Sequence, residues 1–468
     1  MSCSQVLLPL ISIPYISRVL LPDGIGRVSF IDSLSYYFVA IAEFGIAAYG
    51  VREVARTQAD KDKLNKLVSE LVALHCITSA ISLVFYCITV YILWQKIGDI
   101  RLVWFSIAFL VANFFSCEWY YMGIEKFRYI MQRSLISRLL GLAAIFILVK
   151  EPKDYFIYYG IITFAAIINL TTNTVILFRH LHISFKNIRW RLHLQHTKIT
   201  YLISLFYGVT VVLDNVLLGM VSTATAVGLY AMSARIVRLA ANLITDMFQV
   251  LFPRTVALIH EKKEKELEQT FLKSVQIITL LTIPAGTGIF LLALPLVQTI
   301  LSERFYAASL NLEILAILPF IKTYSLFLGK QVLMSHGWER KYLFALVAGA
   351  LIFVASTLVL SWYFHQAGAC YALIVAEAAV LAICYYQVKK AMPRLAIIDY
   401  RTLLQSVVAA AVFVPVIWLI QNYIASPILV VLISLAVCVP VYFAIQAFVM
   451  KNQLLLDLYR SGKTMLHP

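Results

Sequence analysis

The stretch PILVVLISLAVCVPVYFAIQAFV (427–449) runs for 23 positions without a charged residue. About 20 apolar residues in a helix are enough to cross the hydrocarbon core of a bilayer. The chain holds thirteen further apolar runs of comparable length, joined by short connections. These runs lie at about 1–17, 28–50, 67–94, 102–122, 134–149, 155–178, 199–221, 226–251, 272–298, 311–335, 342–364, 368–388 and 403–424. The sequence therefore predicts an all-α polytopic membrane protein with about 14 transmembrane helices.

The composition supports this fold class. Of the 468 residues, 61% are apolar and 13% are charged, whereas an ordinary soluble domain has about 45–50% apolar and about 25% charged residues. A soluble chain could not bury so much apolar surface, which excludes a soluble enzyme, a disordered chain and a disulfide scaffold. No Walker A motif (GxxxxGK[ST]) is present, so the chain does not itself hydrolyse ATP. We expect a transporter rather than an enzyme, with no cofactor and no bound metal.

The basic residues are distributed unevenly between the two sides of the predicted membrane. One set of alternate loops carries 28 Lys and Arg residues and the opposite set carries 7. Cytoplasmic loops are the Lys/Arg-rich ones, so both termini are predicted to be cytoplasmic. The net charge of +15 then reflects membrane topology, and no nucleic-acid partner is expected. Only 17 residues precede Arg18, and we expect the native chain to begin upstream of Met1.

An internal repeat emerges when the chain is shifted by 202 positions. Gly26, Arg52, Val54 and Ala55 then fall on Gly228, Arg254, Val256 and Ala257, respectively. The period contains six spans, so the two halves would share one orientation, as in the parallel repeats of some transporters. This predicts two six-helix lobes plus two extra helices. The expected domains are an N-lobe (1–178), a cytoplasmic basic linker (179–198), a C-lobe (199–388), spans 13 and 14 (389–449) and a cytoplasmic tail (450–468).

Four stretches carry a resemblance to a known family. They are PYISRVLLPDGIGRVSFIDSLSYYFVAIAEFGIAAYGVREVAR (14–56), EWYYMGIEKFRYI (118–130), LDNVLLGMVSTATAVGLYAMSARIV (213–237) and FPRTVALI (252–259). The chain resembles the Wzx-type flippases of O-antigen and other oligosaccharide lipids, which belong to the multidrug/oligosaccharidyl-lipid/polysaccharide superfamily. One position departs from the family pattern, because Leu21 stands where the family usually has glycine.

The resemblance implies a function in the bacterial cytoplasmic (inner) membrane. The protein would translocate an undecaprenyl-diphosphate-linked oligosaccharide to the outer leaflet by alternating access, for assembly of surface polysaccharide such as O-antigen, capsule or exopolysaccharide. Implied partners are this lipid-linked oligosaccharide, membrane lipids, a polysaccharide polymerase and a chain-length regulator. Two alternatives stay open, a cation-coupled drug or metabolite antiporter of the same superfamily and a membrane polysaccharide polymerase.

Charged and polar residues inside the predicted spans are the candidate site, because charges are costly in a bilayer and usually face a cavity. An anionic diphosphate would favour cations, and arginine has a fork suited to phosphate. The candidate substrate-cavity residues are Arg235, Arg238, Asn242, Lys322 and Asp214. The carboxylates that could bind a coupling ion are Glu43, Asp246 and Glu377. The candidate gate and loop residues are Arg18, Arg52, Glu118, Glu125 and Arg254.

Each of these roles has a structural alternative. Arg235, Arg238, Asn242 and Asp246 recur at spacings of 3, 4 and 4 and therefore share one helix face. This face could meet the diphosphate, or its Arg–Asp pairs could tie helices together. Four histidines between positions 180 and 196 lack metal-site spacing, and we expect the segment to be a basic-aromatic helix at the membrane interface.

Overall fold

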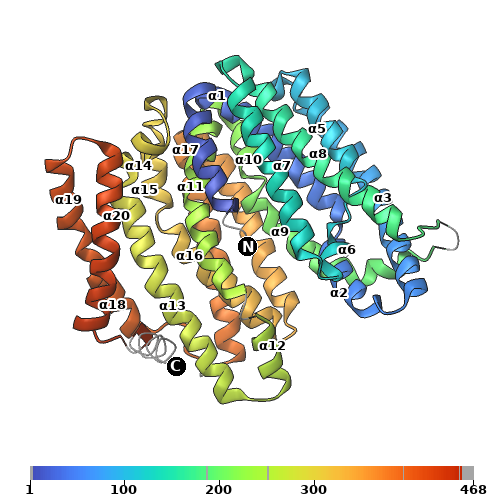
Figure 1. Cartoon of the computed structure of the whole chain (residues 1–468). Coiled ribbons are helices and arrows are strands. Elements are labelled where there is room, and N and C mark those ends of the chain that lie inside the picture. Colours follow the sequence, from blue (N-terminus) through green and yellow to red (C-terminus); the bar gives the residue numbers. More distant parts are fainter. Residues whose placement is uncertain (1–3, 186–187, 250–251, 394, 453, 456–468) are drawn as a thin grey trace. The chain divides into compact units, whose positions relative to one another are not determined.

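A computed structural model describes residues 4–185, 188–249, 252–393, 395–452 and 454–455 of the chain (Figure 1). The chain divides into two compact units, each considered by itself. Unit 1 comprises Met1–Ala231 and Thr357–Gln366, and unit 2 comprises Met232–Ser356 and Ala367–Pro468. Every regular element in the described ranges is helical. The predicted all-α class is therefore confirmed.

Unit 1 is built from ten helices, a 3₁₀ turn and the first turns of an eleventh helix. They are α1 (Ser4–Glu43), α2 (Ile46–Thr57), α3 (Lys61–Ile92), α4 (Trp94–Ile97), α5 (Ile100–Asn113), α6 (Glu118–Gly123), α7 (Phe127–Leu148), η1 (Pro152–Asp154), α8 (Tyr155–His180), α9 (Arg191–Val211), α10 (Asp214–Val221) and α11 (Ala224–Gln249). Side-chain caps start two of them. Asp60 accepts hydrogen bonds from the backbone N–H groups of Asp62 and Lys63, and Asp99 accepts one from Arg101, which satisfies donors that a helix start leaves open.

Unit 2 contains the rest of α11 and the helices that follow it. They are α12 (Phe252–His260), α13 (Glu264–Leu291), α14 (Ala293–Ile300), η2 (Glu303–Phe305), α15 (Ala308–Leu315), α16 (Leu318–Leu326), the π-helix η3 (Phe327–Met334), α17 (Glu339–Ala391), α18 (Tyr400–Ala411), α19 (Phe413–Tyr423), α20 (Pro427–Ala444) and the π-helix η4 (Ile445–Val449). Residues 357–366 of α17 belong to unit 1. The predicted tail at 450–468 falls largely outside the described residues.

Two of the longest helices are broken inside. α17 has 53 residues, which would give a rod of about 80 Å, far longer than the ~30 Å hydrocarbon core. Its backbone leaves the helical conformation at His365, where φ is 49° and ψ is −124°. α1 breaks in the same manner at Leu21, with φ 59° and ψ 171°. Each break falls between two of the predicted apolar runs.

Within the described ranges, eight helices are long and apolar enough to cross a membrane, and the number of candidate spans is up to eleven if each of three bent pairs forms one span. The bent pairs involve α1 with α2, α9 with α10, and α15 with the helix that follows it. The chain is therefore a multi-span helical membrane protein. The number of 14 spans stays a prediction.

The structure corrects one predicted boundary. The run at 134–149 was expected to begin after Arg133, but α7 begins at Phe127. Arg133, which this boundary places in the loop before the run, instead lies inside this helix. Arg133 thus lies about 9 Å along the axis from the helix start. A guanidinium at this place inside a span needs a polar neighbour or a cavity.

The crossing of α1 with α11 in unit 1 has no room for side chains. A Cβ atom added to Gly26 would lie 1.7 Å from the carbonyl oxygen of Ala224. A Cβ atom added to Gly228 would lie 1.9 Å from the carbonyl oxygen of Pro22. Small residues at spacing four are a common way for membrane helices to bring their backbones into contact. The two glycines therefore fix how closely these helices approach.

Candidate functional site

Unit 1 has an open polar cavity of about 470 Å³ between its apolar helices. Its ionisable lining residues are Glu43, Glu118, Arg133, Arg138 and His75. They come from α1, α6, α7 and α3, so four different helices direct polar groups toward one space. Tyr36, Asn113 and Asn169 add further hydrogen-bonding groups. Such a cavity, with balanced charge and many hydrogen-bonding groups, suits a polar uncharged ligand better than a hydrocarbon.

An ion pair forms part of the wall of this cavity. Arg133 Nη2 donates to Glu118 Oε2 at 3.0 Å, and the Arg133 side chain is 10% exposed. Its guanidinium also lies 5.5 Å from the ring centroid of Tyr129. The carboxylate of Glu43 is half-buried in the same cavity. The cavity thus joins Glu43, predicted as an ion ligand, with Glu118, predicted as a gate residue, and adds Arg133 to them.

In unit 2, two of the predicted residues form a pair. Lys322 Nζ of α16 donates to Glu377 Oε1 of α17. The side chains are 15% and 3% exposed. The sequence suggested separate roles for them, a substrate contact for Lys322 and an ion ligand for Glu377. The structure shows that each offsets the charge of the other, as intramembrane ionisable residues generally must.

The four residues of the predicted polar face lie on α11, and their side chains differ in solvent exposure. Arg235 and Asn242 are exposed, whereas Arg238 and Asp246 are half-buried. All four lie in unit 2, on a helix that is continuous from Ala224 to Gln249. Nearby in unit 2 is a smaller cavity of about 280 Å³, lined by Thr245 of α11 and by residues of the π-helix η3. The polar face therefore ends next to a cavity.

The π-helix contributes a residue that the sequence analysis missed. Gln331 lines the 280 Å³ cavity and is 4% exposed, and neither its Oε1 nor its Nε2 has a hydrogen-bond partner among the described residues. Lys330 lines the same cavity. π-helical turns are rare and occur frequently at functional sites. The sequence signal was present, since Lys330 and Gln331 are adjacent polar residues in an apolar run.

Asp214 lies in the interior of unit 1. It has no exposed surface, its Oδ2 accepts a hydrogen bond from Tyr230 at 2.9 Å, and its Oδ1 accepts one from the Asn215 N–H at 2.8 Å. Asn215 Nδ2 in turn donates to Ser33 Oγ of α1 at 2.9 Å. These contacts connect α10 with α1 and α11 within unit 1.

Four of the five predicted gate residues lie on the surface of their units. Arg18, Arg52, Glu125 and Arg254 are all exposed. Arg52 pairs with its neighbour Glu53 at 3.1 Å. Glu125 occupies the turn between α6 and α7 with φ 59°. Of the five predicted gate residues, Glu118 is the one that lines the unit 1 cavity.

The histidine-rich segment differs from the expected single interfacial helix. α8 ends at His180 and α9 begins at Arg191. His193 is buried, with Nε2 2.9 Å from Glu70 Oε2 and Nδ1 2.9 Å from the hydroxyl of Tyr49. The interfacial-helix prediction was therefore wrong for His193, because this ring lies inside unit 1, within hydrogen-bonding distance of Glu70 of α3. Among the described residues, no group of three or more His, Cys, Asp or Glu side chains could hold a metal ion.

The fold is shared with solved transporters. The structure titled "Lipid II flippase MurJ, inward closed conformation" superposes with a TM-score of 0.64 at 13% identity, covering 95% of this chain and 99% of that one. A MOP superfamily transporter from Pyrococcus furiosus superposes with a TM-score of 0.54 at 16% identity, covering 84% and 95%. The chain thus has the fold of the MOP superfamily transporters.

Sequence comparison identifies the family. Residues 1–259 match the family described as "Polysaccharide biosynthesis protein", and the chain belongs to this family. A protein of Escherichia coli (strain K12) named "Putative O-antigen transporter" is 24% identical over 389 residues, which is 81% of this chain and 92% of that protein. A protein of Shigella dysenteriae with the same name is 22% identical over 407 residues, which is 82% of this chain and 97% of that protein. The predicted resemblance is confirmed.

Proposed function

We propose that the protein is a flippase for a lipid-linked oligosaccharide whose lipid carrier is an undecaprenyl diphosphate. The family match over residues 1–259 and the transporter fold support this proposal. The observation that carries it is the polar face of α11, which keeps two arginines inside an apolar helix. An ordinary structural helix has no need of these charges, whereas a diphosphate crossing a membrane must be offset by cations.

The polar face of α11 and the unit 1 cavity would bind different parts of the substrate, because their chemistry differs. Arg235 and Arg238 would bind the diphosphate, with Asn242 as a neutral donor beside them. The unit 1 cavity, with its carboxylates, amides and guanidinium groups, offers hydrogen-bond partners for sugar hydroxyl groups. Asp214 would brace α10 and α11 through Tyr230 rather than touch the substrate.

Ion coupling would use the intramembrane carboxylates. Glu43 is the first candidate, because it is half-buried in the polar cavity. Asp246 and Glu377 are the unit 2 candidates, and Glu377 could exchange Lys322 for a proton or a sodium ion.

We further propose that both termini are cytoplasmic, that the membrane is the bacterial inner membrane, and that the two six-span repeats form the two lobes of the transporter. A polymerase and a chain-length regulator would act on the exported product.

The test is surface glycan measured in cells that contain equal membrane levels of each variant. Arg238→Ala is expected to stop export while the protein still inserts. Arg238→Lys should keep partial activity, because the charge remains and the planar fork is lost. Lys153→Ala, an exposed cation in the turn before α8, is the control and should export normally. Normal export by the double variant Arg235→Ala/Arg238→Ala would overturn the proposed role of this face and favour Lys322 as the diphosphate ligand.

A further inference from the structure

The guanidinium of Arg133 is only partly hydrogen-bonded in the unit 1 cavity. Its Nη2 donates to Glu118 Oε2 at 3.0 Å, whereas its Nε and Nη1 are buried and have no hydrogen-bond partner within the described ranges. The Arg133 side chain is nine-tenths buried, so water has little access to these two donors. Buried donors without a partner cost free energy. Another acceptor in the cavity can therefore compete with Glu118 for this guanidinium.

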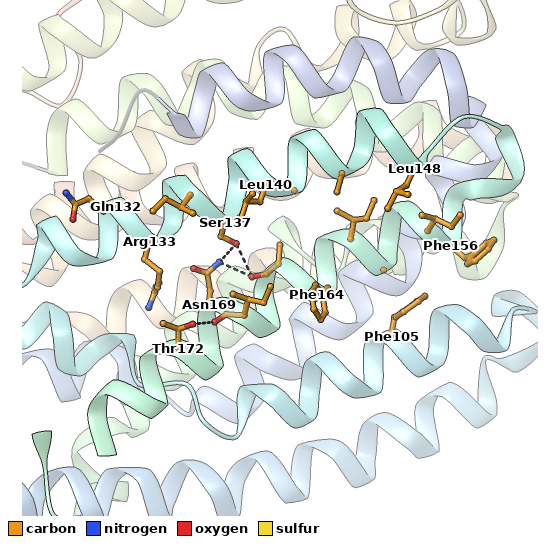
Figure 2. Close-up of a pocket in the computed structure, with 18 of the residues that line it drawn as sticks. Phe105, Gln132, Arg133, Ser137, Leu140, Leu148, Phe156, Phe164, Asn169 and Thr172 are labelled. Atoms are coloured by element: carbon orange, nitrogen blue, oxygen red, sulfur yellow. Dashed lines mark hydrogen bonds between the residues drawn. The ribbon is translucent and has the colours of Figure 1, made fainter. Parts of the chain in front are cut away.

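Two further acceptors line the same cavity. One is the carboxylate of Glu43, for which no ion pair is found among the described residues. The other is Asn169 Oδ1, which is buried and has no partner in the described part of the chain, while Asn169 Nδ2 donates to Ser137 Oγ at 2.7 Å and to the Ala165 carbonyl at 2.9 Å. Figure 2 shows Arg133 and Asn169 on α7 and α8, with these bonds of Asn169 dashed. An arginine side chain has several rotatable bonds, so a change of rotamer can redirect it within the cavity.

The two carboxylates differ in how much they need a cation. Glu43 is half-buried and lies at the bend of a candidate span, between Ile11–Glu43 and Ile46–Thr57. A charge within a span is costly unless an opposite charge offsets it. The side chain of Glu118 is 45% exposed, so solvent can offset its charge. A charged Glu43 should therefore draw the guanidinium away from Glu118.

The ionisable groups around Glu43 come from five helices. They are Tyr36 of α1, His75 of α3, Glu118 of α6, Arg133 and Arg138 of α7 and, beside the cavity, Tyr201 of α9, whose ring stacks on Phe44 with the centroids 4.2 Å apart. The residues that α2, α5 and α8 add to the cavity wall carry no ionisable group. Arg138 is exposed, and His75 Nε2 donates to the carbonyl of Asn113 at 2.7 Å. Among the described lining residues, Arg133 is therefore the buried cation that can respond to Glu43.

We propose that Arg133 exchanges between Glu118 and Glu43, according to whether a monovalent cation, either a proton or a sodium ion, neutralises Glu43. With the cation on Glu43, Arg133 pairs with Glu118 and joins α7 to α6, as in the structure. When the cation leaves, Arg133 turns to Glu43, joins α7 to α1 and releases Glu118. The inference rests on the proposed ion coupling at Glu43 and adds the side chain that responds to the ion. Arg133 is thus a positioning residue.

The experiment measures hydrogen–deuterium exchange of the α6 backbone by mass spectrometry, on the full-length protein in phosphatidylcholine nanodiscs without substrate. Release of Glu118 should raise the exchange rate of α6 by about threefold or more. A rise between acidic and alkaline pH in choline chloride, after correction for the intrinsic pH dependence of exchange, identifies the proton. A rise at constant pH when choline replaces sodium identifies the sodium ion.

Two variants fix the exchange in opposite states. Glu43→Gln is neutral at every pH, so Arg133 should stay on Glu118 and α6 should exchange slowly under all conditions. Arg133→Gln cannot hold Glu118, so α6 should exchange rapidly under all conditions. Arg133→Lys keeps the charge and should retain part of the response. Arg138→Gln removes an exposed cation of the same cavity and helix; it is the matched control and should respond as the wild type does.

A cation response that persists in Glu43→Gln would place the cation on another group, such as His75, and overturn the proposal. A response that persists in Arg133→Gln, or a wild-type protein without a response, would also overturn it. Glu43→Gln decides the question even if Arg133→Gln fails to fold. This readout needs no substrate, whereas the proposed function is tested by export. Loss of export in Arg238→Ala without any cation response would leave the flippase proposal standing and remove the exchange alone.

Discussion

Gly26 and Gly228 contact each other's helices in a reciprocal way. The space next to Gly26 is occupied by the carbonyl of Ala224, and the space next to Gly228 is occupied by the carbonyl of Pro22. Each glycine thus meets the residue four positions before the other. The shift of 202 positions that pairs the glycines also pairs Pro22 with Ala224. This is the contact expected of two equivalent segments around a local two-fold axis, and it supports the internal repeat.

Replacing either glycine by alanine should separate the two helices. A methyl group at Gly26 or Gly228 meets backbone atoms that cannot move aside, so each variant should lose about 1–3 kcal/mol of stability. Thermal unfolding in detergent measures this loss. The double variant should lose less than the sum of the two, because the first methyl group already opens the crossing. Gly288→Ala, where nothing lies within 4 Å, is the control, and an equal loss there would contradict the explanation.

Leu21→Gly should stabilise the protein. Leu21 has φ 59° and ψ 171°, a conformation that suits glycine and costs other residues about 1–3 kcal/mol. The unfolded state of the glycine variant gains about 0.5–1 kcal/mol in entropy, so we expect a net gain of about 1 kcal/mol in thermal unfolding. Leu21→Ala removes the side chain and keeps the strain, and it should show no gain. A stabilised alanine variant would mean that the leucine side chain, not the backbone, is the unfavourable element.

Breaking the Lys322–Glu377 pair should destabilise unit 2. Lys322→Met or Glu377→Gln leaves one buried charge without its partner, at a cost of about 3–5 kcal/mol. The double replacement Lys322→Met/Glu377→Met should recover most of this loss. A double-mutant cycle on thermal unfolding gives the coupling free energy. Additive single effects would show that the two charges act independently. Lys153→Met, with its exposed side chain, serves as the neutral control.

Topology can be tested with a membrane-impermeant maleimide. In a background with Cys87→Ser, which removes an exposed native thiol, Ala59→Cys places a thiol in the turn between α2 and α3. We expect no labelling of this variant from outside the cell, because loops rich in Lys and Arg generally stay on the cytoplasmic side. Lys153→Cys, in a predicted outer turn, should label readily. The reverse result would invert the proposed orientation.

The sequence was sufficient to predict the fold class, because a bilayer allows few backbone structures and long apolar runs identify helices directly. Helix boundaries were harder. Lys61, Arg191 and Glu264 stand in the first turns of α3, α9 and α13, several residues before the apolar runs begin. Charged residues lie in helix ends at the membrane surface, and hydropathy alone does not reveal that these residues are helical.

The site was predicted only in part, since helical periodicity describes one helix at a time. The shared face of α11 was visible as a spacing pattern. The pairing of Lys322 with Glu377 depends on how α16 and α17 pack, across 55 positions of sequence, and no local pattern encodes it. Arg133 was missed for a different reason. The predicted run begins just after this charge, so the prediction assigns Arg133, which lines the unit 1 cavity, to a loop.

The reciprocal glycine contact has an evolutionary consequence. A contact that presents the same two groups from both sides is the kind that two identical chains make in a homodimer. A six-span ancestor could have closed such a contact with a second copy of itself before its gene was duplicated and fused. On this view, Gly26 and Gly228 descend from one codon, and the crossing of α1 and α11 preserves an ancient subunit interface inside a single polypeptide.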